Sequence, residues 1–357
     1  MKIGILSFHR AANYGAVLQA YALQRYLMLQ GHDVEIVDYQ CLPIEQMHSP
    51  NYFLHCKGFK NKLKQLIRRP IKTKKRKLFD DFIERKLELS AERCIKKEDI
   101  KKELCNKYNI VITGSDQVWN PILTLCDTTY LLDFADKEVR KVSYAASIGL
   151  NDLSEEYVTL YKKCLSEFYK ISVREKQAKR ILLEKMELKS AEVLDPTLLL
   201  NADEWKCFLK EPEQRNYVLL YMIKQNHYLI EYADLLAKEK ELTVIFISDT
   251  MIKRRGIVYI PYATPEEWVG LFLNASYVIT NSFHGTAFSL NFNKKIVIGL
   301  SKDKKNGNSR ITDLLNELEV TYENDDGIID LTDIVEWEPV NTKMNELRVR
   351  SCQFLNM

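Results

Sequence analysis

The chain has 357 residues, of which 46% are hydrophobic and 28% are charged, and its formal net charge is +3 at pH 7. This length and apolar content predict more than one folded domain and exclude a disordered protein. The small net charge argues against a protein that binds polyanions over its whole surface. We find no run of about 18 apolar residues and no signal peptide, so we expect a cytoplasmic protein without a transmembrane helix.

The first half of the chain alternates strands and helices. An apolar strand at 2–8, helical spacing over 17–30 and a second strand at 33–40 predict a βαβ unit. Further strands are expected to end at Gly114, near Ser147, at Val173 and at Asp195, with a helix over about 155–168.

The alternation restarts after about residue 203. Strands are expected in YVLLYMI, TVIFIS, IVYIPYA, SYVITNS and KIVIGLS, and helices near 227–240, 264–275, 284–293 and 341–354. Two such series predict two doubly wound, Rossmann-like α/β domains that face each other across a cleft, with ligands beyond the carboxyl ends of the strands. We expect 1–200 and 201–340 to form these domains, with 341–357 able to pack back on the first.

A basic run extends from Lys57 to Lys77, with eleven Lys or Arg and no acidic residue. Pro70 divides it into two expected helical pieces. The run is either a solvated helix face or a peripheral contact with anionic lipid or a diphosphate-linked acceptor, which would place the protein at the inner membrane face. Nucleic acid is disfavoured because the run matches no nucleic-acid-binding motif.

The loop after the first strand carries His9, Arg10, Asn13, Tyr14 and Gly15. Its position predicts ligand contacts, and the following helix offers N–H groups to an anion or a hydroxyl. No G-x-G-x-x-G or G-K-[ST] sequence is present, so a dinucleotide or P-loop site is excluded. A polar capping loop is the alternative.

The loop after the third strand carries Ser115, Asp116, Gln117, Trp119 and Asn120. Amides and carboxylates beside an aromatic face are typical of carbohydrate sites. The alternative is an Asp that caps a helix next to a core Trp.

Arg174 and Asp195 each follow a strand. Arg174 is placed to hold a carboxylate or phosphate, or else to pair with Glu175 at the surface. Asp195 precedes Pro196, where a simple turn residue is common.

The segment VITNSFHGTA, at 278–287, passes from a strand through a polar turn into a helix. Ser282, His284, Gly285 and Thr286, with the N–H groups of the new helix, predict an anion site beside an imidazole suited to acid or base chemistry. The next strand is followed by the basic loop 301–310, which ends at Arg310. That loop either covers a ligand or is simply solvated.

With these pieces in order, the chain resembles the polysaccharide pyruvyl transferase family over nearly its whole length. The resemblance is carried, in this order, by ANYGAVLQAYAL, GSDQVWN, YAASIG, SVRE, VLDPTLLL, TNSFHGTAFSL and SRITDLL. It implies a GT-B-like fold and transfer of pyruvate from phosphoenolpyruvate to a sugar as a ketal. The acceptor would be a lipid- or nucleotide-linked saccharide for a surface or capsular polysaccharide.

The resemblance also implies roles for individual residues. His284 would be the general acid, and Asp116 would help to deprotonate the acceptor. Ser282 stands where the family often has an arginine, so the charge that holds the donor would come from Arg174, Arg310 or a loop lysine. The predicted donor ligands are Arg174, Ser282, Gly285, Thr286 and Arg310. The predicted acceptor ligands are Asn13, Tyr14, Ser115, Gln117 and Trp119.

Two other functions fit the same pattern. A GT-B glycosyltransferase would use the His284 turn for the diphosphate of a nucleotide sugar, and a carbohydrate-assembly protein would keep the fold without catalysis. The eight cysteines include no C-x-x-C pair, so we expect no metal and no cofactor besides the donor substrate.

Overall fold

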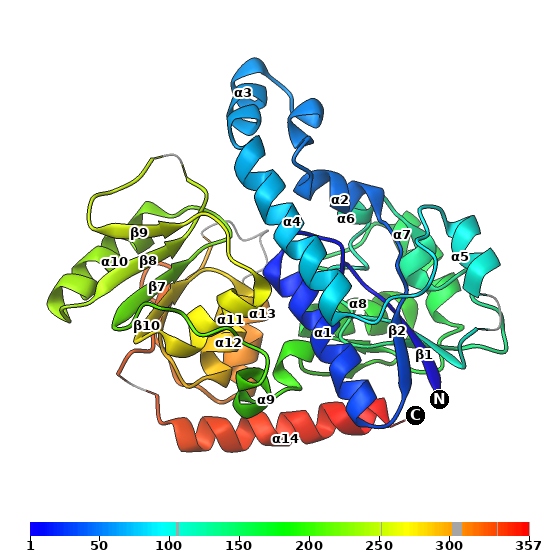
Figure 1. Cartoon of the computed structure of the whole chain (residues 1–357). Coiled ribbons are helices and arrows are strands. Elements are labelled where there is room, and N and C mark those ends of the chain that lie inside the picture. The colour runs from blue at the N-terminus through cyan, green and yellow to red at the C-terminus, as the bar shows by residue number, and fades with distance from the viewer. Residues whose placement is uncertain (105–106, 251, 302–308, 334, 357) are drawn as a thin grey trace. The chain divides into compact units, whose positions relative to one another are not determined.

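The computed structural model describes residues 1–104, 107–250, 252–301, 309–333 and 335–356 (Figure 1). The chain forms two compact units. The first comprises Met1–Lys62, Phe79–Leu199 and Leu347–Met357, and the second comprises Leu63–Leu78 and Leu200–Glu346. The basic segment Leu63–Leu78 therefore groups with the second unit, although it lies within the expected range 1–200.

The first unit is built on a parallel sheet with strand order β2-β1-β3-β4. Its strands are short, and the two central ones, β1 and β3, are largely apolar and almost fully buried, as expected for strands covered on both faces. Two short strands, β5 and β6, pair with each other, and isolated bridges join β5 to the end of β4. The strands of this unit are β1 (Lys2–Leu6), β2 (Asp33–Ile36), β3 (Ile110–Thr113), β4 (Arg140–Ser143), β5 (Ser172–Val173) and β6 (Ala191–Glu192).

The strand order of the first unit reverses between β1 and β3, because β2 lies on one side of β1 and β3 lies on the other. Loops that leave a doubly wound sheet at such a reversal diverge and leave room for ligands. The helices of this unit are α1 (Tyr14–Leu29), α2 (Leu42–His48), η1 (Tyr52–His55), α5 (Lys97–Leu104), α6 (Pro121–Thr124), η2 (Thr128–Leu131), α7 (Glu155–Leu165), α8 (Lys176–Met186) and η3 (Pro196–Leu198).

The second unit contains a larger sheet with strand order β12-β11-β10-β7-β8-β9, which reverses between β7 and β10. All its pairs are parallel except β11 with β12. β12 was not predicted, because a run of three residues after a turn at Gly327 gives no periodic signal. The strands are β7 (Tyr217–Tyr221), β8 (Thr243–Ile247), β9 (Ile257–Ile260), β10 (Tyr277–Thr280), β11 (Lys295–Gly299) and β12 (Ile328–Asp330).

Helices cover this sheet much as the sequence predicted. They are α9 (Ala202–Lys206), α10 (His227–Glu239), α11 (Pro265–Asn274), α12 (Phe283–Asn291) and α13 (Ser309–Glu317). No helix in the described ranges combines the length and apolarity that a membrane span needs.

The basic run forms two helices that separate where the sequence predicted, α3 (Phe59–Ile67) and α4 (Arg69–Lys86). Pro70 is the second residue of α4, where its missing N–H breaks no helical hydrogen bond. The buried residues of α4 are Phe79, Phe82 and Ile83, all in its second half.

The last helix, α14 (Trp337–Leu355), ends within the first unit. The buried hydroxyl of Ser351 accepts a hydrogen bond from the Leu194 N–H at 3.0 Å and donates one to the Leu347 carbonyl at 2.7 Å. The Phe354 ring packs 6.4 Å from that of Tyr144. Because Leu194 N–H bonds to α14 and Pro196 has no N–H, β6 is shorter than the expected strand.

We expect Ser351→Ala to destabilise the protein by about 1–3 kcal/mol, because it leaves the buried Leu194 N–H without its acceptor. The matched control is Ser166→Ala, which removes an exposed hydroxyl that bonds a carbonyl at the end of α7. Urea denaturation followed by fluorescence measures both. Equal midpoints for the two variants would show that the Ser351 hydrogen bond contributes nothing.

Candidate functional site

The carboxyl edge of the first sheet is organised by a tight turn after β3. Asp116 has a φ of +80°, a conformation that non-glycine residues seldom adopt. Its carbonyl accepts from Ser147 N–H at 3.0 Å, and its carboxylate accepts from Gln117 N–H at 2.9 Å. The Asp116 side chain is 17% exposed, so the strained backbone presents a carboxylate that solvent can reach.

A buried ion pair joins the ends of β3, β5 and β6. Arg174 Nη1 donates to Asp195 Oδ2 at 2.7 Å and to Ser115 Oγ at 3.2 Å, and the Ser115 hydroxyl donates to the same carboxylate at 2.9 Å. The other oxygen of Asp195 accepts from the N–H and hydroxyl of Thr197. Arg174 Nη2 lies 3.9 Å from Asp116 Oδ1.

The surroundings of Arg174 keep it charged. Burial would lower the pKa of its guanidinium, but the carboxylates of Asp195, Asp116 and Glu175 raise it above the usual value. The Arg174 side chain is only 2% exposed. Arg174, which was predicted to contact the donor, is thus buried in this structure with its guanidinium donating to Asp195.

Asp195 was expected to be a simple turn residue, and the structure gives it a larger part. It does cap η3, but it also holds Arg174 and Ser115. Sequence reasoning missed this pair because it depends on two neighbouring strands whose registers cannot be read from the chain.

The predicted acceptor ligands divide into two groups. Trp119 and Tyr14 belong to the core, because Trp119 is fully buried with its ring N–H on the Tyr130 carbonyl, and Tyr14 packs on Phe79. Neither ring is accessible to a sugar, because the Trp119 and Tyr14 side chains are 0% and 2% exposed. The alternative weighed for Trp119, a core residue, therefore holds.

Asn13 and Gln117 remain at the loop edge and are partly exposed. Asn13 caps α1 through Gly15 N–H, and Gln117 accepts from Asn120 Nδ2 at 3.0 Å. The Gln117 side chain lies over Gly149, where any Cβ would overlap it.

A second buried charge cluster follows β1 and β2. Asp38 accepts from Arg10 Nε at 2.8 Å and Nη2 at 2.6 Å, and His9 Nε2 lies 3.2 Å from the same carboxylate. Burial alone would raise the pKa of Asp38, but the bonds from His9 and Arg10 hold it well below its usual value. The sequence showed His9 and Arg10 but not their partner, since Asp38 ends a different strand.

In the second unit, the turn between β10 and α12 is held by its own polar groups. Ser282 Oγ accepts from Gly285 N–H at 3.2 Å, and the Thr286 hydroxyl donates to the Ser282 carbonyl at 3.1 Å. Gly285 is required because any Cβ there would overlap the Thr280 hydroxyl. Ser282, Gly285 and Thr286, which were predicted to contact the donor, are buried and shape the helix terminus.

His284 and Arg310 both lie against the same aromatic ring, that of Phe283. The Phe283 ring lies 5.2 Å from the His284 imidazole, and the Arg310 guanidinium lies over it at 6.0 Å. Both side chains are partly exposed. The start of α13 thus brings a permanent cation onto the same aromatic ring that the imidazole contacts at the start of α12. Residues 302–308 of the predicted basic loop lie outside the described residues.

Asn281 connects the two strands at which the second sheet reverses. Its Oδ1 accepts from Ile223 N–H at 2.8 Å, and its Nδ2 donates to the Lys224 carbonyl at 2.7 Å. This fixes the loop after β7 next to the turn of His284 and places the exposed Lys224 at the same edge.

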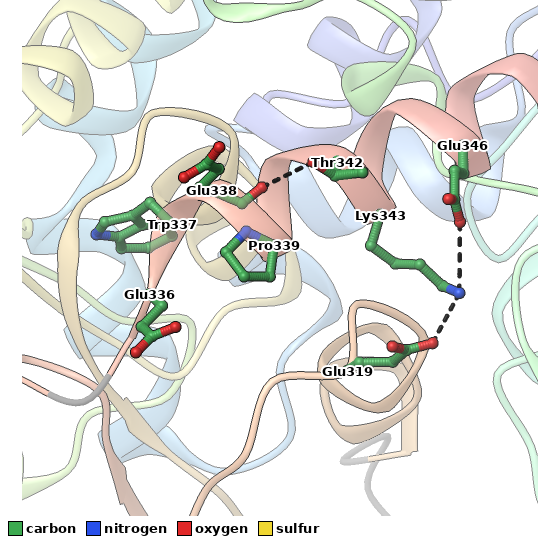
Figure 2. A pocket seen from close by; sticks show the side chains of 8 residues that line it. All are labelled: Glu319, Glu336, Trp337, Glu338, Pro339, Thr342, Lys343 and Glu346. Carbon is green, nitrogen blue, oxygen red and sulfur yellow. Dashed lines mark hydrogen bonds and ion pairs between the residues drawn. The ribbon is translucent and has the colours of Figure 1, made fainter.

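A separate hollow of about 620 Å³ lies at the start of α14 (Figure 2). Its volume would suit a small ligand. Four glutamates line it, and Lys343 is held by Glu319 at 2.7 Å and Glu346 at 3.5 Å. The excess of negative charge makes it unsuitable for an anionic donor, and it contains none of the predicted site residues. The lining residues are Glu319, Glu336, Trp337, Glu338, Pro339, Thr342, Lys343 and Glu346.

We expect Asp195→Ala to lower the free energy of unfolding by about 3–5 kcal/mol, because it leaves the Arg174 charge buried without its carboxylate. Asp203→Ala is the matched control, since Asp203 forms an exposed pair with Lys206, and no measurable change is expected there. Chemical denaturation measures both variants. A similar stability for both would show that the Arg174 pair is dispensable.

Asp38→Asn tests the second cluster through pH. A carboxyl whose folded pKa is depressed stabilises fully above its unfolded pKa of about 3.9 and loses that contribution as the pH falls below it. The stability difference between wild type and Asp38→Asn should therefore be constant from about pH 8 to pH 5 and shrink below about pH 4. Asp33→Asn, on the exposed end of β2, controls for the loss of one carboxylate. A difference that grows in acid would contradict the assignment.

Comparison with solved structures supports the fold. A putative UDP-N-acetylglucosamine 2-epimerase from Listeria monocytogenes is 9% identical, with a TM-score of 0.51 over 99% of this chain and 89% of that one. The UDP-GlcNAc 2-epimerase of Neisseria meningitidis bound to UDP-GlcNAc is 10% identical, with a TM-score of 0.50 over 100% and 94% of the two chains. At this identity the likeness shows the fold alone, which is GT-B-like as predicted.

Comparison with curated proteins found no match. A family model described as polysaccharide pyruvyl transferase matches residues 13–301, which is well over half of the 357 residues. The matched region contains the turns of Asp116, Arg174 and His284 in the predicted order. The chain therefore belongs to the polysaccharide pyruvyl transferase family and is a transferase.

Proposed function

We propose that this protein transfers the pyruvyl group of phosphoenolpyruvate to hydroxyls of a lipid- or nucleotide-linked saccharide and forms a pyruvate ketal for a surface or capsular polysaccharide. The observation that carries the proposal is the grouping of His284 and Arg310 around Phe283 at the N-terminus of α12. It joins a titratable imidazole, a permanent cation and a helix terminus, which are the groups that an enol phosphate needs.

Arg310 is the proposed anion ligand. Phosphoenolpyruvate carries a phosphate and a carboxylate, and a guanidinium binds either with paired hydrogen bonds. Arg174 is committed to Asp195, and Ser282 stands where the family often has an arginine, so Arg310 is the cation best placed to replace that charge. Lys224, anchored through its carbonyl by Asn281, is a second candidate at this edge.

His284 is the proposed general acid. It protonates the methylene carbon of the enol phosphate, which leaves an oxocarbenium-like centre at the neighbouring carbon. One sugar hydroxyl attacks that carbon and loses its proton, phosphate then leaves, and a second hydroxyl closes the ketal with loss of its own proton. Protonation from a positioned imidazole is suited to neutral pH.

The proposed acceptor side uses the polar loops of the first unit. Asp116 is the base that helps to deprotonate the attacking hydroxyl, because its carboxylate is exposed and held by a strained turn. Asn13 and Gln117 offer amide groups for the remaining hydroxyls. Ser115 and Arg174 do not contact the acceptor in this proposal; their hydrogen bond fixes the strand ends that carry the residues that do.

The first experiment measures phosphoenolpyruvate binding by calorimetry and turnover by phosphate release. We expect His284→Gln to lower turnover by about 10²–10⁴-fold with a smaller change in affinity, because proton transfer is lost while the anion ligand stays. Arg310→Ala should weaken binding about 10-fold or more. His227→Gln and Arg215→Ala, both exposed in the second unit, are matched controls.

The same experiment separates the alternatives. No binding heat from phosphoenolpyruvate, together with binding of uridine or guanosine diphosphate, would overturn the proposal in favour of a glycosyltransferase that uses a nucleotide sugar. Ligand binding and cellular polysaccharide that are unchanged in His284→Ala would instead identify a non-catalytic assembly protein.

A further inference from the structure

The short helix α3 exposes an unusual amount of apolar side chain. Phe59 is 80% exposed, and Leu63, Leu66 and Ile67 are 45–49% exposed. None of the residues of α3, all of which are described, is buried. Leu54, which precedes α3 in η1, is another 64% exposed apolar residue. A contiguous set of such residues marks a surface that contacts something else.

The apolar residues of α3 lie on one face. At about 100° per residue, the positions 59, 63, 66 and 67 fall within a sector of about 100°. Lys60 and Lys64 border this sector on one side, and Lys62 borders it on the other. The helix therefore has an apolar stripe with a lysine margin on both sides, and we call this the α3 face.

The positive charge of the protein is concentrated around this face. The run Lys57–Lys77 carries a formal charge of +11 and the whole chain +3, so the remaining residues together carry −8. The α3 face is thus a local cationic region on a chain that is otherwise acidic. Any partner that it recruits by charge must be anionic.

The basic residues beyond α3 differ from those on it. Arg68 pairs with Asp249, and Lys74 lies 6.0 Å from the centre of the Tyr262 ring, so the residues after α3 make contacts within the second unit. Burial lowers the pKa of Lys75 to about 8, as expected for an ammonium group covered by protein. In the part of the chain that the structure describes, Lys60, Lys62 and Lys64 make no ion pair with a carboxylate, and all three side chains are exposed.

We propose that α3 lies in the plane of an anionic lipid bilayer, with its apolar face at the boundary between headgroups and acyl chains. The stripe supplies the apolar area, and the lysine stems on its margins let the ammonium groups reach the lipid phosphates (Figure 1 shows α3 next to α4). The proposal goes beyond pyruvyl transfer and does not depend on it.

Charge and composition favour a bilayer over other occupants. A second copy would bring the same lysine margins together, and like charges would oppose the contact. A nucleic acid would use the lysines, and Phe59 could stack on one base, but the aliphatic Leu63, Leu66 and Ile67 would have no partner. An anionic lipid surface offers phosphates to the lysines and acyl chains to the apolar stripe.

The test is co-sedimentation of the full chain with vesicles of phosphatidylcholine alone or with about one third phosphatidylglycerol. We expect binding only to the anionic vesicles, weakened as salt rises. Replacing Phe59, Leu63 and Leu66 by Ser should weaken binding at least about 10-fold. Replacing Lys60, Lys62 and Lys64 by Gln should weaken it by roughly 100-fold at low salt.

Matched controls exclude general effects. Leu235→Ser removes an exposed leucine on α10, and a triple variant removes three exposed lysines elsewhere, Lys163→Gln, Lys176→Gln and Lys179→Gln. Both controls should bind like wild type. Circular dichroism and phosphate release with a water-soluble acceptor check that the α3 variants remain folded and active, so loss of vesicle binding is distinguishable from loss of pyruvyl transfer.

Three outcomes would overturn the proposal. One is wild-type vesicle binding by the apolar triple variant. Another is equal binding of the wild type to neutral and anionic vesicles. The third is a wild-type dimer in analytical ultracentrifugation that the apolar triple variant dissociates, which would assign the α3 face to a second copy of the chain.

Discussion

Parallel strands end at the same edge of a sheet, and in each unit of this protein that edge must satisfy the polar groups of several loops at once. In the first unit the solution is a buried carboxylate, Asp195, that accepts from groups carried by β3, β5 and its own turn. In the second unit it is a neutral amide, Asn281, that bridges the loops after β7 and β10. These contacts fix the positions of the loops that carry the candidate catalytic residues.

Burying charge is costly, and both clusters of the first unit offset part of that cost by pairing each buried carboxylate with hydrogen-bond donors. Asp195 uses both carboxylate oxygens, and Asp38 is held by both Arg10 and His9. Such pairs tolerate little rearrangement, since moving one partner leaves the other desolvated and unpaired. They therefore suit a scaffold that has to hold a strained residue such as Asp116 in one conformation.

In the turn that carries His284, some residues hold the backbone in place and others are available for chemistry. Ser282, Gly285 and Thr286 form the hydrogen bonds of the turn that begins α12, while the His284 imidazole stays partly exposed and shares the Phe283 ring with Arg310. A similar division holds for the basic run, where residues after α3 contact the second unit and those on α3 face outward. Neighbours in sequence thus differ in role because their side chains leave the backbone in different directions.

Periodicity and local chemistry alone were enough to predict the two α/β series, the break near Pro70 and the turns at Gly114 and His284, while the family came from the resemblance of the motifs. These features depend on residues close together in the chain, where apolar spacing and turn residues act directly on the backbone. The burial of Trp119 and Tyr14, the commitment of Arg174 to Asp195 and the pairing of Asp38 with His9 and Arg10 were decided only by the tertiary structure. Each depends on which strands become neighbours and which face of an element is covered, and no local pattern contains that information.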